Sequence, residues 1–277
     1  MSGAGRCLYF YLVMRYFLEL AYRGTQYYGW QRQPNGLSVQ EVLETALTTI
    51  LREPVALVGS GRTDAGVHAG QQFAHFDTHR PLPPNLLRSV NSLIPGDVAV
   101  YDCFPVQADA HARFTALFRR YQYQISRRKD PFRDGLAYVF TLPLDVERMN
   151  EAADRLRHRV DFESFSRVKT DVNTFNCRID FAHWEQKPDD DLTFHIRADR
   201  FLRGMVRAIV GTLLEVGQGR LSVAEFDRII DGRDRRRAGR SAPANGLSLV
   251  EVGYPPDVFS QRQNLTGTRV VDSDKSV

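Results

Sequence analysis

The feature that most constrains the fold is the order in which two hydrophobic patterns alternate along the chain. Residues 15–21 alternate between apolar and polar side chains, as in a half-buried strand, whereas residues 39–50 repeat apolar side chains at helical spacing. The pattern continues with a strand at 55–58, a strand at 71–77, a helix at 83–93 and a strand at 98–103. This βαββαβ order predicts a ferredoxin-like unit, in which an antiparallel sheet is backed by two helices.

The second part of the chain repeats this order of elements without repeating the sequence. We expect strands and helices at 118–125, 145–156, 178–184, 192–198, 202–215 and 247–254, with a short helix opening at 222. Ser38 with Glu41 and Ser222 with Glu225 have the spacing of capping boxes at helix starts.

We therefore predict an α+β protein built from two βαββαβ (RRM-like) halves that form one continuous antiparallel sheet with a central cleft. The expected boundaries are an N-terminal half at 15–104 and a C-terminal half at 105–256, with an extension at 1–14 and a flexible, polar tail at 257–277. The first thirteen residues do not have the layout of a signal peptide, and we expect Met14 to be the natural start.

The amino-acid composition indicates which classes of binding partner and which compartment to expect. Arginine clusters at 127–128 and 233–240 give the 277-residue chain a pI near 9.0 and favour an anionic partner such as nucleic acid, although a solvated basic surface would give the same composition. No apolar run approaches the ~20 residues of a membrane span. Three widely spaced cysteines indicate a reducing compartment, which we expect to be the cytoplasm, and do not indicate a disulfide framework or a metal site.

The segment GRTDAGVHAG, residues 61–70, is the strongest candidate for a functional site. Its glycines permit backbone angles that other residues avoid, so it reads as a shaped loop between two strands. The carboxylate of Asp64 lies two residues from the guanidinium of Arg62, which favours an ionised nucleophile or base. An ordinary hairpin turn with a surface ion pair is the alternative.

Several segments, in order, resemble the tRNA pseudouridine synthase A (TruA) family over about residues 15–254. They are RYFLELAYRGTQYYGWQRQ, GRTDAGVHA, HARFTALFRRYQY, DFESF, FLRGMVRAIVG and APANGLSLVEVGY. The resemblance implies the pseudouridine synthase fold and isomerisation of uridine to pseudouridine at positions 38, 39 and 40 in the anticodon arm of tRNA. It also implies a homodimer and a reaction that needs no cofactor and no metal.

The resemblance also assigns roles to individual residues. Asp64 would be the essential nucleophile or base, and Tyr121 would stack on the target base. Arg62 would help to extrude that base or hold a flanking phosphate, and Arg207 would be the cationic partner of Asp64. The remaining expected site residues are Arg203 facing the RNA, Leu247 lining the base pocket and His68 supporting the loop.

From the pattern alone, each of these residues also has a purely structural interpretation. Tyr121 and Leu247 fit one face of a half-buried strand, and an arginine beside an apolar helical stripe commonly reaches out to solvent. Arg23 and the Asp109–Ala110 pair depart from the family pattern outside the catalytic positions. The principal alternative function is a non-catalytic RRM-like RNA-binding protein, and a small-substrate glycosidase is disfavoured because a second carboxylate is missing from the motif.

Overall fold

The computed structural model describes residues 13–167 and 173–262. The expected extension up to residue 12 and the tail from residue 263 lie outside the described residues. The elements are β1 (Met14–Tyr22), α1 (Val39–Leu51), β2 (Val58–Gly59), β3 (His68–Thr78), α2 (Leu86–Leu93), β4 (Val98–Val106), β5 (Phe118–Ser126), β6 (Tyr138–Val139), α3 (Val146–Arg155), β7 (Ile179–Gln186), β8 (Leu192–Ala198), α4 (Met205–Gly217), α5 (Val223–Asp231) and β9 (Leu247–Gly253).

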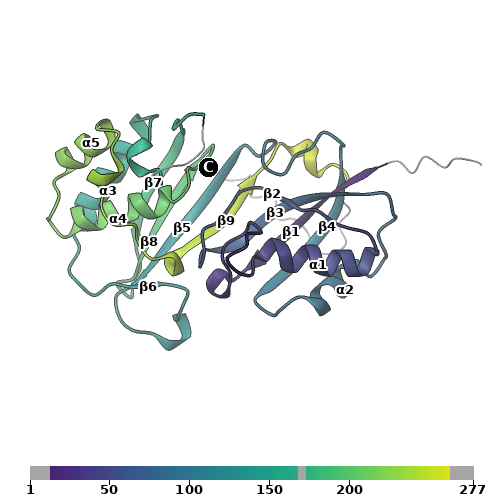
Figure 1. Cartoon of the computed structure of the whole chain (residues 1–277). Helices are drawn as coiled ribbons and strands as arrows, with labels where there is room; N and C mark the ends of the chain where they lie inside the picture. The colour runs from purple at the N-terminus through teal and green to yellow at the C-terminus, as the bar shows by residue number, and fades with distance from the viewer. Residues whose placement is uncertain (1–12, 168–172, 263–277) are drawn as a thin grey trace, which may run out of the picture.

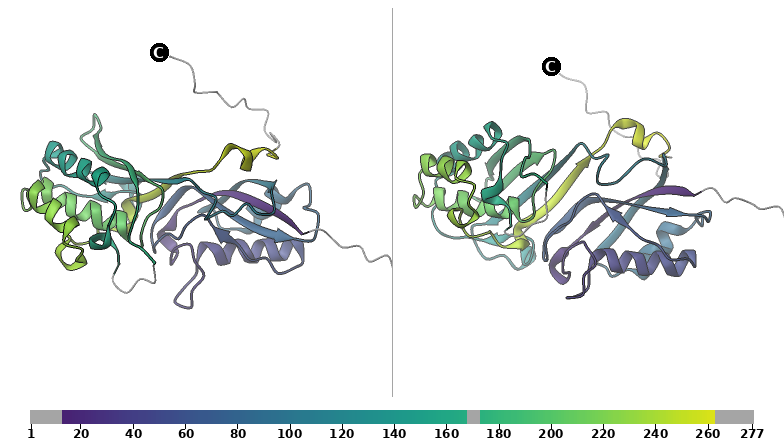
Figure 2. Two further views of the ribbon diagram at one scale, coloured as in Figure 1. Left: turned by 90° about the horizontal axis from the view of Figure 1, so that it is seen from above. Right: turned by 45° about the horizontal axis from the view of Figure 1, so that its top comes forward.

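Within the described ranges the strands form one nine-stranded sheet in the order β4-β1-β3-β9-β5-β8-β7, with β2 paired to β3 and β6 paired to β5. Figure 1 shows α1 and α2 grouped at one end of this sheet and α3, α4 and α5 at the other, and Figure 2 shows the same two groups from other sides. The central strands β3, β9 and β5 run between the two groups.

The sheet is mixed, which corrects the expectation of an antiparallel sheet. Strand β9 runs antiparallel to β5 but parallel to β3, with His68 opposite Ser248 and Ala69 opposite Leu249. Strand β9, the last strand of the described chain, enters the centre of the sheet and runs in the same direction as β3. The sheet is continuous, but its central junction is a short parallel ladder.

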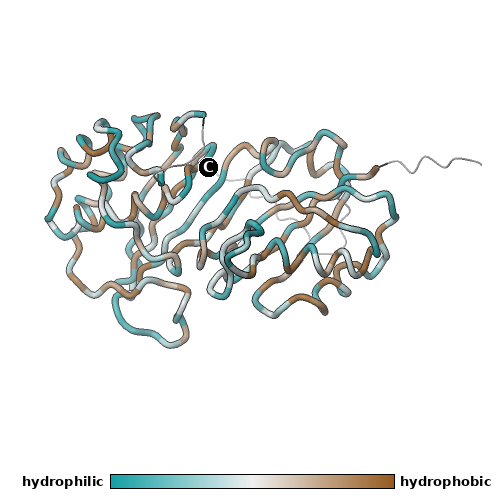
Figure 3. The backbone as a smooth tube through the Cα atoms, in the orientation of Figure 1, coloured by the Kyte–Doolittle hydropathy of each residue, from teal (hydrophilic) through white to brown (hydrophobic). Residues whose placement is uncertain are grey.

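Buried hydrophobic side chains stabilise each of the two ends of the molecule. Figure 3 shows hydrophobic segments recurring along the strands and helices at both ends of the molecule. The largest fully buried side chains come from both parts of the chain and include Phe17, Trp30, Phe73, Phe165 and Phe194. Each such side chain contributes roughly 1.5–3 kcal/mol by leaving water.

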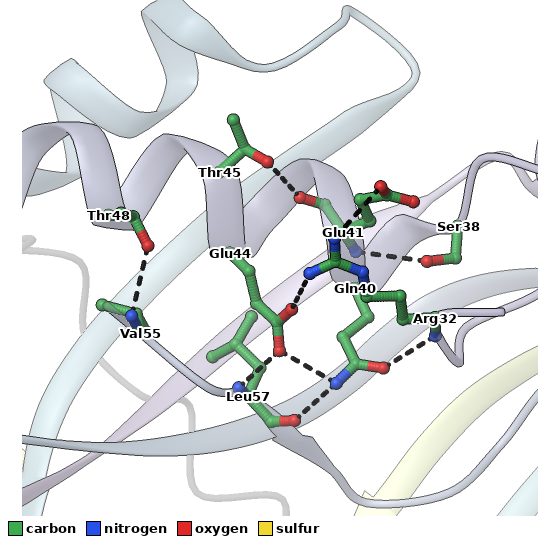
Figure 4. Close-up of polar contacts among 9 residues, drawn as sticks. All are labelled: Arg32, Ser38, Gln40, Glu41, Glu44, Thr45, Thr48, Val55 and Leu57. Atoms are coloured by element: carbon green, nitrogen blue, oxygen red, sulfur yellow. Dashed lines mark hydrogen bonds and ion pairs between the residues drawn. The ribbon is translucent and has the colours of Figure 1, made fainter. Parts of the chain in front are cut away.

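The helix starts follow the expected capping chemistry in one case and depart from it in another. Ser222 and Glu225 form a complete, reciprocal capping box at α5. At α1 the Ser38 hydroxyl accepts the Glu41 amide N–H at 3.2 Å, but the Glu41 carboxylate faces Arg32, 3.7 Å away, and does not return the bond (Figure 4). The cap at α1 is therefore one-sided because a nearby cation competes for the carboxylate.

The ordered chain also continues past Pro256, where a flexible tail was expected to begin. Val258 is buried, and Phe259 packs against Phe73 and Phe104. The guanidinium of Arg262 pairs with two carboxylates of the sheet, at 2.5 Å from Glu19 and 2.7 Å from Asp102. Residues 256–262 thus pack on the N-terminal half.

Candidate active site

The loop between β2 and β3 places Asp64 at the junction of the two halves of the sheet. A turn fixes the aspartate, since the backbone N–H of Val67 donates to the Asp64 carbonyl at 3.1 Å. Thr63 is buried beside it, and its hydroxyl bonds to the hydroxyl of Tyr22 at 2.9 Å. The side chain of Asp64 is 24% exposed, so its carboxylate is partly buried but still accessible to solvent.

The cation that contacts Asp64 is Arg207, from the first turns of α4. Arg207 Nη1 lies 3.4 Å from Asp64 Oδ2, and Arg207 Nε donates to the Ala242 carbonyl at 2.7 Å. The second bond orients the guanidinium, because Nε and Nη1 lie in one rigid plane. The start of α4 also lies close to the carboxylate. Gly204, in the left-handed region at φ +72°, would place an added Cβ 3.9 Å from Asp64 Oδ2.

Arg62 does not supply this positive charge, in contrast to the electrostatic role inferred from its spacing. Its Nε donates to the side-chain oxygen of Gln31 at 2.9 Å, and its side chain is exposed. The Asp64 carboxylate therefore pairs with Arg207 on α4 and not with Arg62 of its own loop.

A hydrogen-bond network holds the segment that orients Arg62 (Figure 4). The Gln40 side chain accepts the backbone N–H of Arg32 at 2.9 Å and donates to Leu57 O and to Glu44, each at 2.9 Å. Glu44 in turn accepts the Leu57 N–H at 2.8 Å. Since Gln31 directly precedes Arg32, this network on α1 fixes the residue to which Arg62 bonds.

Tyr121 lies on β5 within electrostatic reach of Asp64. Its ring is buried and meets Phe201 edge-on, with centroids 5.1 Å apart. Burial raises the pKa of Tyr121 to about 12; the positive charge of Arg119 opposes this rise and the negative charge of Asp64 adds to it. The raised pKa makes this hydroxyl a weaker acid than that of an exposed tyrosine.

The other expected site residues occupy different positions relative to the loop. His68 accepts the Gly24 N–H on Nδ1 at 3.0 Å and has Nε2 3.2 Å from the Asn245 carbonyl, so it bridges the two halves and does not bond residues 60–67. Leu247 is buried at the start of β9, opposite Tyr123. The side chain of Arg203 is exposed, and its backbone carbonyl accepts the Arg167 N–H at 3.0 Å.

Arg119 is a residue of the site region that the sequence reasoning missed. Its guanidinium donates to the carbonyls of Ser60 at 2.9 Å and Asp199 at 3.0 Å, and also to those of Ala116 and Arg113. Burial lowers the pKa of this guanidinium. Its position two residues before Tyr121 on one strand, and hence on the same face, was the available signal.

Among the described residues, no group of three or more His, Cys, Asp or Glu side chains is arranged to hold a metal ion. No helix in the described part of the chain is long and apolar enough to cross a membrane. The chemistry that the arrangement offers is that of one carboxylate held by a guanidinium, beside a buried tyrosine.

These features define an α+β protein with one mixed sheet, in which a single carboxylate pairs with a guanidinium near the central strands. A family model described as tRNA pseudouridine synthase matches residues 20–115 and 152–255. The curated tRNA pseudouridine synthase A of Porphyromonas gingivalis is 52% identical over 249 residues, which cover 88% of this chain and 99% of that protein.

Two further relatives bear the same name. That of Bacteroides thetaiotaomicron is 52% identical over 90% of this chain and 94% of its own length, and that of Ligilactobacillus salivarius is 38% identical over 88% and 97%. The chain belongs to the tRNA pseudouridine synthase A family.

Proposed function

We propose that this protein isomerises uridine to pseudouridine at positions 38, 39 and 40 of tRNA, in the anticodon stem-loop. Family membership supports the enzyme class, an isomerase that acts on tRNA. The observation that carries the proposal is the contact between Asp64 and Arg207, since it presents one carboxylate, held by a guanidinium, near the centre of the sheet. A protein that only bound RNA would not need this pair.

One carboxylate is enough for the isomerisation. Asp64 starts cleavage of the bond between uracil N1 and the ribose, as a nucleophile or as a base. The departing uracil spreads its negative charge over the ring and two carbonyl groups, so the reaction does not require a strong general acid. The base then turns and rejoins the ribose through C5. A bond that Asp64 has formed to the ribose breaks as the C5 bond forms, and a proton that it has taken from the ribose is returned. The C5 proton then leaves and N1 becomes protonated. The composition of the nucleoside is unchanged, so no oxidant or group donor is consumed.

The neighbouring residues prepare the base for this step. A uridine in a stem must leave its stack before Asp64 can reach it, and Arg62, whose side chain is exposed, would help to extrude the base or hold a flanking phosphate. The ring of Tyr121 offers a face on which uracil can turn, because stacking tolerates in-plane rotation. Leu247 adds an apolar wall, Arg203 faces the RNA, and His68 keeps the two halves in register.

The proposal also covers how the protein binds tRNA, its oligomeric state and its location in the cell. We expect two βαββαβ halves to enclose a cleft for the anticodon arm, and two chains to form a homodimer in which one tRNA contacts both. The cytoplasm is the expected location, because the substrate is found there.

The test is to map pseudouridine in tRNA treated with the purified protein, using tRNAs that carry uridine at one of the three positions. Conversion at these positions is the expected result. Tight tRNA binding without any conversion would instead support the non-catalytic RNA-binding alternative.

A further inference from the structure

The loop between β5 and β6, residues 127–137, carries the most exposed large hydrophobic side chain in the described part of the chain. Phe132 is 93% exposed and lies in the short 3-10 turn Pro131–Arg133. Figure 1 shows the loop, in teal, projecting below β6. Single exposed apolar residues are common on protein surfaces, so the meaning of this one depends on its surroundings.

The residues beside Phe132 are positively charged and available. Arg128 and Lys129 are both exposed, and neither forms an ion pair with any residue in the ranges that the structure describes. Of the two acidic residues in the loop, Asp130 uses its carboxylate to accept the Phe132 N–H at 2.9 Å, and Asp134 is exposed. The turn therefore presents an aromatic ring together with two cations that have solvent as their partner.

The turn is held in place at both of its ends. The buried Asp191 accepts the backbone N–H of Arg127 at 2.8 Å and also pairs with Arg133. The Arg127 side chain donates to the Leu142 carbonyl at 2.8 Å. Phe132 is therefore exposed on an anchored turn. Arg127 and Arg133, which flank it, are both bonded to Asp191.

The loop is also connected to the catalytic junction. The side-chain amide of Asn245 donates to the Ala137 carbonyl at 2.9 Å, while the backbone carbonyl of Asn245 meets His68 Nε2 at 3.2 Å. His68 begins the strand that follows the Asp64 loop. Two hydrogen bonds therefore link the end of this loop to the strand that carries the catalytic segment.

We propose that the turn of residues 128–133 is a second RNA contact, in which Phe132 stacks on an unpaired base and Arg128 and Lys129 bind the flanking phosphates. This inference rests on the proposed function and adds where the substrate is held outside the catalytic centre. Aromatic rings interleaved with cations are the usual platform for unpaired nucleotides. A second copy of the chain is the less suitable occupant, since docking an apolar surface here would remove water from two cations that have no acidic partner.

The test compares binding and chemistry in variants of the loop. Phe132→Ala should weaken binding of an anticodon stem-loop RNA by roughly 5- to 100-fold, the range expected for one lost stacking contact. Phe132→Trp should retain binding, and Tyr101→Ala, which removes another exposed ring on the distant outer strand β4, should bind as the wild type does. The single-turnover rate at saturating RNA should stay close to that of the wild type in Phe132→Ala.

A second measurement tests the charges. Replacing both Arg128 and Lys129 with alanine should reduce the slope of log Kd against log salt concentration by about 1–2. Unchanged melting temperatures would show that each variant folds, as expected for side chains that lie in solvent.

Wild-type affinity in Phe132→Ala would overturn the proposal, and so would a change in oligomeric state seen by sedimentation, because the ring would then serve a protein interface. The failure of the proposed function is a different result. In that case the wild type would bind the RNA but make no pseudouridine, while the effect of Phe132→Ala on binding would still be measurable.

Discussion

Arg207 Nη1 lies 3.4 Å from Asp64 Oδ2, although 143 positions separate the two residues in the sequence. The carboxylate comes from the loop before β3 and the guanidinium from α4, so each half of the sheet contributes one member of the pair. The same guanidinium is oriented by the Ala242 carbonyl. The pair therefore forms only when the segments that carry Asp64, Arg207 and Ala242 have come together.

Substitution of Asp64 by asparagine is expected to abolish pseudouridine formation while tRNA still binds. Asparagine keeps the shape of the side chain but cannot act as a nucleophile or base, and such groups typically contribute about 10²–10⁴-fold to the rate. Single-turnover assays with labelled tRNA measure the rate, and filter binding measures the affinity. Asp189→Asn, at an exposed carboxylate, serves as the control. Turnover above about a hundredth of the wild-type rate would contradict the role of Asp64.

The two functions of Tyr121 should separate in two variants. The ring would supply the stacking face, and the hydroxyl, whose pKa is raised to about 12 mainly by burial, would take part in removing the C5 proton. Tyr121→Phe should lower the rate at saturating tRNA with little change in affinity, and Tyr121→Ala should lower both. If both variants kept full activity, Tyr121 would be a packing residue only.

The bond between Gln31 and Arg62 predicts that the two residues act as a unit. Arg62→Ala should slow the single-turnover reaction strongly, and Gln31→Ala should slow it less, because the arginine remains but is no longer oriented. The double variant should be about as slow as Arg62→Ala alone, so the two effects should not add. Additive effects in this double-mutant cycle would show that Gln31 contributes independently of Arg62.

Stability should fall as the pH is lowered from 7 to 5, in part because of His75. Burial, together with the nearby charges of Arg15 and His111, lowers its pKa to about 4, while Asp77 acts in the opposite direction. The unfolded chain takes up a proton near pH 6.5 whereas the folded chain does not, so acid favours unfolding by about 2 kcal/mol over this interval. His75→Asn retains an acceptor for the Ala112 N–H and should flatten the dependence of the melting temperature on pH. A variant with the same acid sensitivity as the wild type would rule His75 out as the cause.

The elements that depend on local pattern were predictable from the sequence. The helix expected at 39–50 is α1, Val39–Leu51, and the strand expected at 118–125 is β5, Phe118–Ser126. The helix expected at 202–215 begins later, at Met205, because Gly204 takes up a left-handed conformation that the apolar spacing does not reveal.

The contacts of the site were less predictable from the sequence, because they join segments that are far apart in the chain. Nothing in the spacing of Arg62 and Asp64 shows that Arg62 turns to Gln31, since that bond depends on how α1 holds the segment around residue 32. The four carbonyls that surround Arg119 likewise come from separate segments and meet only in the folded chain. The same holds for the parallel pairing of β3 with β9, which no local periodicity encodes.

The place of β9 also sets the order of events during synthesis. This strand is among the last parts of the described chain to be translated, yet it lies between β3 and β5 in the middle of the sheet. Because domains fold as the chain emerges, β1 to β4 can pair early, but the start of β3, at His68 and Ala69, lacks its partner strand until residues 247–253 have left the ribosome. A chain truncated before this strand would therefore hold the Asp64 loop beside an unpaired stretch of β3, so residues 247–253 must be made before the sheet around Asp64 is complete.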